Sequence, residues 1–70
     1  MAKKVPYGNR VKALREAAGE TQAGLATTVG VTRQTIIAIE QGRYSPSLET
    51  AFRIARAFGV QLDDVFFWEG

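Results

Sequence analysis

The stretch VTRQTIIAIEQGRYSPSL, residues 31 to 48, decides the fold. Thr32 stands where a helix N-cap is expected, because its hydroxyl can accept a hydrogen bond from the free N–H groups of a first turn. Three polar side chains follow, and then come isoleucines at positions 36, 37 and 39. One buried stripe on a helix does not need all three of these isoleucines. This helix is therefore apolar on two sides, while its first residues are long and polar.

The sequence on either side divides into further short helices, most with a polar cap residue in front and a glycine behind. We expect a helix between Asn9 and Gly19 and others at about residues 22 to 29, 32 to 41, 48 to 58 and 62 to 66, with caps at Asn9, Thr21, Thr32 and Ser47. Inward apolar positions follow the helical repeat. They are Val11, Leu14 and Ala18, then Leu25, Ala26 and Val29, then Ile36 and Ile39, and in the fourth helix Leu48, Ala51, Phe52, Ala55 and Phe58. The predicted fold class is all-α with five helices.

The chain ends have a different composition. Val5-Pro6-Tyr7 and Phe66-Phe67-Trp68 are aromatic and β-branched, which favours extended backbone. They either pair as a small two-stranded antiparallel sheet or fold over the bundle. We expect one domain, residues 1 to 70, with terminal extensions at 1 to 8 and 66 to 70.

Composition limits the function. The chain has 70 residues, is 46% hydrophobic and contains neither cysteine nor histidine. Disulfides, thiolate chemistry and histidine-based catalysis or metal binding are thereby excluded. We expect no enzyme activity, no cofactor, no metal site and no small-molecule ligand. No segment has the pattern of a secretory signal or a membrane span, so we expect a soluble cytoplasmic protein with no membrane partner.

Charge is unevenly distributed along the chain. Residues 1 to 43 hold seven bases and three acids, a net charge of +4, whereas residues 44 to 70 hold two bases and four acids, a net charge of −2. Such a division favours one face for a polyanion and another for a different contact. Taken alone it is a weak signal, because many solvated surfaces divide their charge in this way.

The segment from residue 22 to residue 41 has the pattern of a helix-turn-helix. Two eight-to-ten-residue helices are joined by Gly30 and Val31, and glycine tolerates the positive φ that a tight turn requires. Ala26 is small where the two helices would cross. The residues Leu25, Val29, Val31, Ile36 and Ile39 would form an apolar wedge between them.

This arrangement, from Thr21 to Gly42 and on through Tyr44-Ser-Pro-Ser-Leu48, resembles the helix-turn-helix of phage Cro and repressor proteins, the XRE family. The resemblance covers roughly residues 9 to 66. It is similar to the short regulators that consist of this domain and a terminal extension. It implies a lambda-repressor-like DNA-binding domain, usually dimeric, that occupies operator DNA and represses or sometimes activates transcription.

The resemblance and the chemistry of the third helix together predict its DNA contacts. Arginine can bind guanine O6 and N7, glutamine can bind adenine N6 and N7, and an exposed isoleucine can cover a thymine methyl. The predicted base-reading residues are Arg33, Gln34, Ile37 and Gln41. Alternatively, Ile37 packs on a neighbouring helix or on a dimer partner.

Other polar residues have separate predicted roles. Candidate phosphate contacts are Gln22, Thr32, Thr35, Arg43 and Ser45, while Arg10 and Lys12 are weaker candidates that fit solvated charges better. The resemblance further implies a structural ion pair between Arg15 and Glu40. Such a pair orients helices more than it adds net stability.

Pairing of two copies is expected because one small module offers few contacts, whereas two can span half-sites about 34 Å apart on a near-palindromic operator. The predicted homodimer interface comprises Leu62, Val65, Phe66, Phe67 and Trp68. Rival hypotheses are an antitoxin or a restriction–modification controller with the same DNA-binding domain, and a protein-interaction adaptor that binds no DNA.

Overall fold

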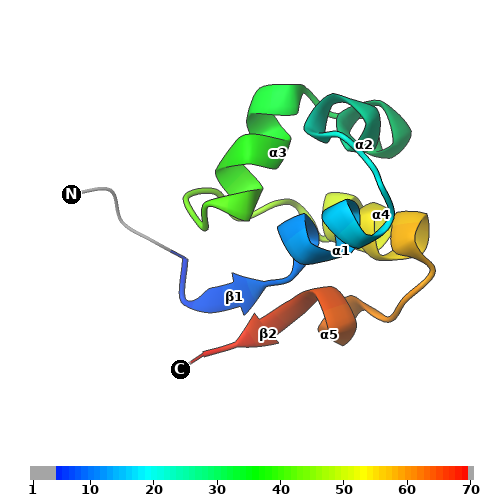
Figure 1. Ribbon diagram of the computed structural model, residues 1–70. Coiled ribbons are helices and arrows are strands. Elements are labelled where there is room, and N and C mark those ends of the chain that lie inside the picture. The colour runs from blue at the N-terminus through cyan, green and yellow to red at the C-terminus, as the bar shows by residue number, and fades with distance from the viewer. Residues whose placement is uncertain (1–4, 70) are drawn as a thin grey trace.

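The computed structural model describes residues 5 to 69. In chain order its elements are β1 (Tyr7–Asn9), α1 (Val11–Ala17), α2 (Gln22–Val29), α3 (Arg33–Glu40), α4 (Leu48–Phe58), α5 (Leu62–Val65) and β2 (Phe66–Trp68). Figure 1 shows α2 and α3 together at one end of the molecule and the two strands at the other. The predicted five-helix fold with a small terminal sheet is confirmed. No helix among the described residues is both long enough and apolar enough to span a bilayer.

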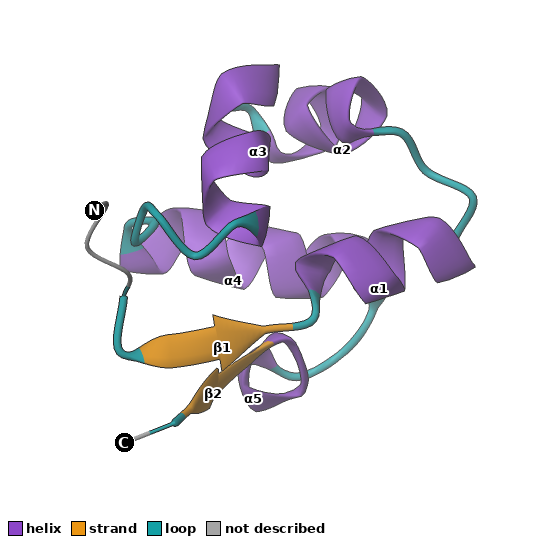
Figure 2. Ribbon diagram, turned by 60° about the vertical axis from the view of Figure 1, so that its left-hand side comes forward, coloured by secondary structure: helices purple, strands orange, loops and turns teal. Residues whose placement is uncertain are grey.

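The two chain ends pair as an antiparallel sheet, in which Tyr7 lies opposite Trp68 and Gly8 opposite Phe67. The first strand begins two residues later than the predicted segment. Glycine at position 8 leaves room for the Phe67 ring, because a Cβ there would lie 2.5 Å from it and the ring would have to move. The Arg10 guanidinium lies over the same ring, 4.5 Å from its centroid. The sheet is thus fastened to the start of α1 (Figure 2).

Three helices begin at the predicted hydroxyl caps. The side chains of Thr21, Thr32 and Ser47 accept hydrogen bonds from the backbone N–H three residues later in α2, α3 and α4. The prediction for Asn9 is wrong, because Arg10 occupies the cap position of α1 and Asn9 ends β1. Its Oδ1 still accepts from the Val11 N–H, at 3.0 Å.

The core lies between the helices and beneath the sheet. It consists of Val11, Leu25, Ala26, Val29, Ile36, Ile39, Ile54, Ala55 and Val65, with Leu14, Val31, Phe58, Val60 and Phe66 packed against it. The predicted wedge between α2 and α3 is therefore confirmed. About 25 cal/mol for each square ångström of apolar surface removed from water makes this cluster the main source of stability.

The buried stripe of α4 differs from the prediction. Leu48 and Phe52 were expected inside but are 66% and 48% exposed, whereas Ile54 is fully buried. The inward positions are 51, 54, 55 and 58, the ordinary three-and-four spacing of one helix face. Leu48 and Phe52 lie beside that stripe, so they remain apolar at the surface.

Candidate nucleic-acid interface

The turn between α2 and α3 depends on Gly30. Its φ of +85° lies in the left-handed region, which L-residues with a Cβ adopt only at a cost. The N–H groups of Gly30 and Val31 both donate to the carbonyl of Ala26, closing the end of α2. Val31 then leads directly to the Thr32 cap, so only a short link separates the two helices. The chain consequently reverses with α3 held against α2.

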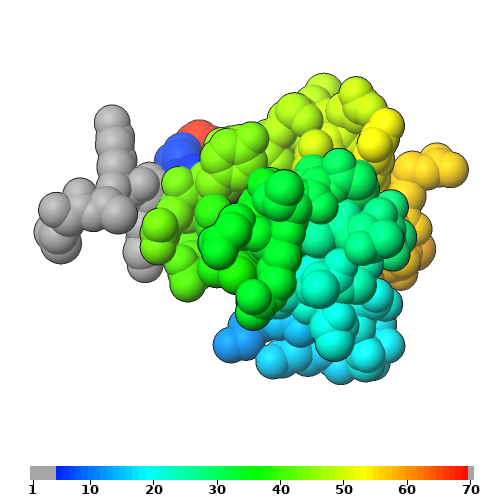
Figure 3. Space-filling model, turned by 90° about the horizontal axis from the view of Figure 1, so that it is seen from above, coloured from blue at the N-terminus to red at the C-terminus, as the bar shows by residue number. Residues whose placement is uncertain are grey.

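Two faces of α3 have opposite chemistry, which answers why the helix carries three isoleucines. Ile36 and Ile39 are 0% and 1% exposed and pack in the core. Arg33 and Gln34 are exposed, and Ile37 is half-buried. Figure 3 shows α3 in green at the centre of one face of the molecule, with α2 on one side and the chain that follows α3 on the other. The third isoleucine is therefore not part of the core.

The sequence analysis did not single out Ala38 on this side of α3, because alanine carries no polar group. Ala38 is half-buried and lies four residues after Gln34 and three before Gln41. Residues at these spacings share one side of a helix. The helical spacing is the signal that would have found it.

Arg15 of α1 and Glu40 at the end of α3 form an ion pair, with Nε 2.7 Å from Oε2. Their side chains are only 11% and 5% exposed. Arg15 also donates to the carbonyl of Glu20, at 2.9 Å. The hydrogen bond to Glu40 is the main reason that the pKa of Arg15 is raised, against the opposing effect of burial. The pair joins α1 to α3.

Gln22 belongs to the same network. Its Nε2 donates to Oε1 of Glu40 at 3.1 Å, and its Oε1 accepts from Arg33 at 3.5 Å. A carboxylate only accepts hydrogen bonds, so Glu40 dictates which way the Gln22 amide points. The predicted phosphate contact at Gln22 has to share a side chain that already bonds within the protein. A backbone contact at the start of α2 does not have this restriction.

The remaining candidate phosphate residues lie at the two ends of α3. Thr32 and Thr35 are at its start, where their hydroxyls are 3.0 Å apart and the Thr32 hydroxyl also caps the helix. Arg43 follows its end and donates to Oε1 of Gln41 at 2.9 Å. The Ser45 hydroxyl is hydrogen-bonded to that of Tyr7 at 2.7 Å. All four residues flank the exposed face of the helix.

The two weaker candidates differ in their surroundings. Arg10 stacks on Phe67 and donates to the carbonyl of Asp64 at 3.2 Å. It therefore fastens α1 to the C-terminal strand, on the side of the molecule that carries the sheet. Lys12 is exposed on α1.

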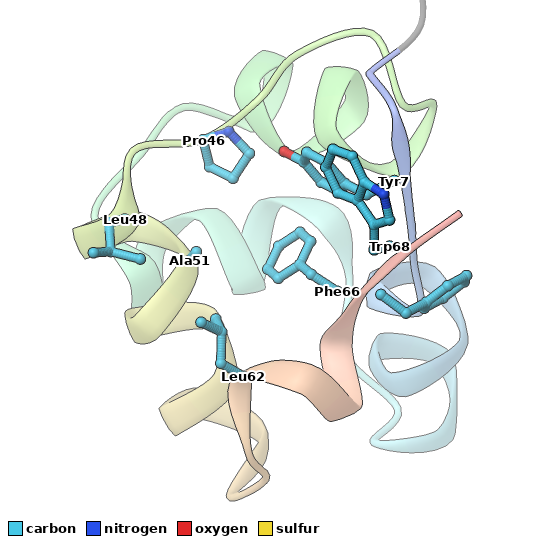
Figure 4. Close-up of a pocket in the computed structure, with 8 residues that line it drawn as sticks. Tyr7, Pro46, Leu48, Ala51, Leu62, Phe66 and Trp68 are labelled. Atoms are coloured by element: carbon cyan, nitrogen blue, oxygen red, sulfur yellow. The ribbon is translucent and has the colours of Figure 1, made fainter. Parts of the chain in front are cut away.

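An apolar groove of about 360 Å³ lies beside the sheet (Figure 4). It is lined by Tyr7, Pro46, Leu48, Ala51, Leu62, Phe66, Phe67 and Trp68. Four of the five predicted interface residues line this groove, and Trp68 is 72% exposed. The fifth, Val65, is 0% exposed and belongs to the core. It faces inward on the single short turn of α5, so it is not available to a partner.

Taken together, the fold and its surface define a class of protein. Two helices meet across a glycine turn, and the second exposes arginine and glutamine side chains. The loop that follows it carries further hydrogen-bond donors. The protein is a helix-turn-helix domain of the Cro and repressor type.

Comparison with known proteins identifies the family. The chain belongs to the helix-turn-helix family HTH_3, DNA-binding transcriptional regulators, whose model matches residues 11–65. It is 52% identical over 61 residues to an uncharacterized HTH-type transcriptional regulator of Methanocaldococcus jannaschii, covering 87% of this chain and 92% of that one. The immunity repressor protein of Bacillus phage phi105 is 38% identical over 58 residues, which cover 83% of this chain and 40% of that protein.

Among solved structures, the chain is similar to the restriction-modification controller protein C.AhdI from Aeromonas hydrophila. The TM-score is 0.74 and the identity 29%, over 79% of this chain and 83% of that one. The family and these relatives are regulators and not enzymes.

Proposed function

We propose that this regulator binds a near-palindromic operator as a homodimer and represses transcription, with α3 in the major groove. The observation that carries the proposal is the division of α3 into a buried side, Ile36 and Ile39, and an exposed side that begins with Arg33 and Gln34. Long polar side chains held at the start of a rigid helix are suited to reading base edges.

Each residue on the outer side of α3 has a proposed contact with DNA. Arg33 binds guanine O6 and N7, Gln34 binds adenine N6 and N7, and Ile37 covers a thymine methyl. Because Oε1 of Gln41 accepts from Arg43, the Gln41 amide presents its N–H groups outward as donors. Ala38 contributes a small apolar contact at the same surface.

Phosphate contacts fix the position of α3 on the duplex. We assign these contacts to the side chains of Thr32 and Thr35 at the start of the helix and of Arg43 and Ser45 after its end. Gln22 and the first N–H groups of α2 contact phosphates of the other DNA strand. Contacts on both sides of one groove set the register but carry no sequence information.

The homodimer forms through the apolar groove beside the terminal sheet. Leu62, Phe66 and Phe67 are partly buried in its wall and Trp68 projects from its rim. A two-fold axis through one such face makes the interface self-complementary, because each copy offers both a groove and a protruding tryptophan. Two reading helices about 34 Å apart then match successive turns of the same DNA face.

Repression follows from occupancy of an operator, and the similarity to a phage immunity repressor supports this sign of regulation. The similarity to C.AhdI supports a second candidate, a controller of a restriction–modification system. The two candidates predict the same DNA contacts and differ in the genes that lie next to the bound sites.

A salt titration tests DNA binding itself. Neutralised phosphates release counterions, so the logarithm of the binding constant should fall linearly with that of the salt concentration, with a slope of about −0.9 for each phosphate contact. We expect a slope of about −2 or steeper for the dimer, because Arg43 is the one cationic phosphate contact assigned to each copy. Absence of measurable binding to any duplex at low salt would favour a protein-interaction adaptor.

A further inference from the structure

The N-terminal strand is tied to the end of the DNA-reading helix. The Val5 N–H donates to the carbonyl of Gly42 at 3.0 Å. Two residues on, the Tyr7 hydroxyl is hydrogen-bonded to Ser45 at 2.7 Å. Another two residues on, Nδ2 of Asn9 donates to the carbonyl of Ile39 at 2.9 Å. Tyr7 and Asn9 lie two apart on β1, so their side chains point to the same side, and the Val5 N–H adds a main-chain bond to the same segment, residues 39 to 45.

These bonds act where α3 ends and an irregular segment begins. The carbonyl of Ile39, in the last turn of α3, accepts from the Gly42 N–H, and Asn9 adds a second donor to it. Beyond α3, residues 43 to 47 form neither helix nor strand. The Tyr7 hydroxyl is a restraint on this segment, and it is applied at Ser45.

Tyr7 can apply that restraint because its ring is itself held in place. The ring meets that of Phe66 edge to face, with the centroids 5.9 Å apart. Its backbone pairs with Trp68 across the sheet. Figure 4 shows the Tyr7 ring in the wall of the groove, overlapping Trp68 in this view, with its hydroxyl directed toward the segment that contains Pro46. A phenol fixed at both ring and backbone holds its oxygen in one place.

We propose that Tyr7 is a positioning residue for DNA binding, which holds the loop after α3 so that Arg43 and Ser45 meet the phosphates without a further ordering step. The proposal rests on the proposed function, because those two residues are its phosphate contacts. A loop ordered in advance loses less conformational entropy on binding, so the benefit appears as affinity. This gain in affinity is the same for every DNA sequence, since phosphate contacts do not distinguish sequences.

The test compares two variants that each remove one phenol oxygen. Tyr7→Phe deletes the hydroxyl but keeps the ring on Phe66 and the strand pairing. Tyr44→Phe is the matched control, since Tyr44 is 49% exposed, adjoins Ser45 and has no side-chain hydrogen bond to the part of the chain that the structure describes. Dissociation constants are measured for each at several salt concentrations, on a selected operator and on an unrelated duplex.

We expect Tyr7→Phe to bind both duplexes about threefold to tenfold more weakly, the range set by one net hydrogen bond. The salt slope should become shallower, by up to about 0.9 for each site at which Arg43 loses its phosphate. The ranking of operators should be unchanged. Tyr44→Phe should bind as the wild type does.

Ser45→Ala identifies the route of the effect. If Tyr7 acts through Ser45, adding Tyr7→Phe to Ser45→Ala should weaken binding no further, because the two changes remove one and the same bond. Wild-type affinity for Tyr7→Phe, or a loss fully accounted for by weaker dimerisation in sedimentation, would overturn the inference. If the wild-type protein itself binds neither duplex, the proposed function fails, and the inference with it.

Discussion

Ile37 and Ile39 have the same side chain two positions apart and serve different purposes. Ile39 is 1% exposed and packs in the core, whereas Ile37 is half-buried on the outer side of α3. The sequence predicted this division from spacing alone, since 36 and 39 share a helical face and 37 does not. What the sequence left open was whether Ile37 meets another helix, a partner or DNA.

Truncation of each isoleucine should separate the two purposes. Ile39→Ala should lower the free energy of unfolding by about 2 to 5 kcal/mol, because it leaves a cavity in a packed core. Ile37→Ala should cost about 1 kcal/mol or less and weaken binding to sites with thymine at one position. Urea unfolding and binding to base-substituted duplexes provide the two readouts. Equal stability losses for the two variants would contradict the assignment.

Glu40 provides a second prediction at this scale. Glu40→Gln leaves the Arg15 guanidinium largely buried without a counter-charge, which should cost about 3 kcal/mol or more in urea unfolding. Glu16→Gln is the control, because Glu16 is an exposed acid on α1 and its loss should cost less than about 1 kcal/mol. A Glu40→Gln protein as stable as this control would show that the pair is unimportant for the fold.

The pH dependence of this pair has a definite sign on the basic side. A folded pKa above the unfolded one means that the Arg15 contribution is complete below the unfolded value and is lost only as pH rises through the still higher folded value. The difference in unfolding free energy between the wild type and Arg15→Met should therefore stay constant from neutral pH to about pH 10. A difference that shrinks over this range would contradict it.

Among the elements, the turn between α2 and α3 is the one most open to a single substitution. Gly30→Ala forces a Cβ into left-handed backbone and brings it to 3.3 Å from the Arg53 guanidinium, so we expect a loss of about 1 to 2 kcal/mol. Gly24→Ala is the comparison within α2, where alanine is the better helix former, the flexible end of Glu20 must move and the Thr21 hydroxyl, 3.1 Å from the added Cβ, must shift slightly. Gly24→Ala should be no less stable than wild type, and a reversed order of the two variants would refute this account of the turn.

At the level of elements, sequence reasoning succeeded where a local signal exists and failed where contacts between distant segments decide. Caps and glycines marked α2, α3 and α4 to within a residue, because capping is a local interaction. Asn9 has the chemistry of a cap, yet it was drawn into a strand by pairing with Phe66, which is far away in the sequence. The stripe of α4 was misassigned at Leu48 and Phe52 because apolar character does not reveal whether a residue meets the core or remains at the surface.

For the whole molecule, the candidate interface shows the same limit. The types of residue at the reading face follow from helical spacing, but the link from Glu40 through Gln22 to Arg33, and the bond from Tyr7 to Ser45, join segments that no local pattern connects. Val65 illustrates the converse. Its neighbours in the sequence line the groove, and only packing shows that Val65 itself is inside.

The proposed homodimer makes a prediction at this scale. Trp68→Ser removes an exposed ring from the groove rim, so the single chain should keep its stability while dimerisation weakens by about tenfold or more. Ala57→Glu, on an exposed part of α4 that does not line the groove, is the control and should dimerise normally. Sedimentation equilibrium measures both. An unchanged dimer in Trp68→Ser would move the interface elsewhere.

The central claim is that α3 reads DNA sequence through Arg33 and Gln34, and selection of bound sites from genomic fragments tests it most directly. The wild type should enrich a near-palindromic motif, and Arg33→Ala and Gln34→Ala should each lose preference at one base pair per half-site while retaining weak general binding. Each lost contact should relax discrimination by about 1 to 3 kcal/mol. Recovery of the same motif with undiminished preference by both variants would contradict the account.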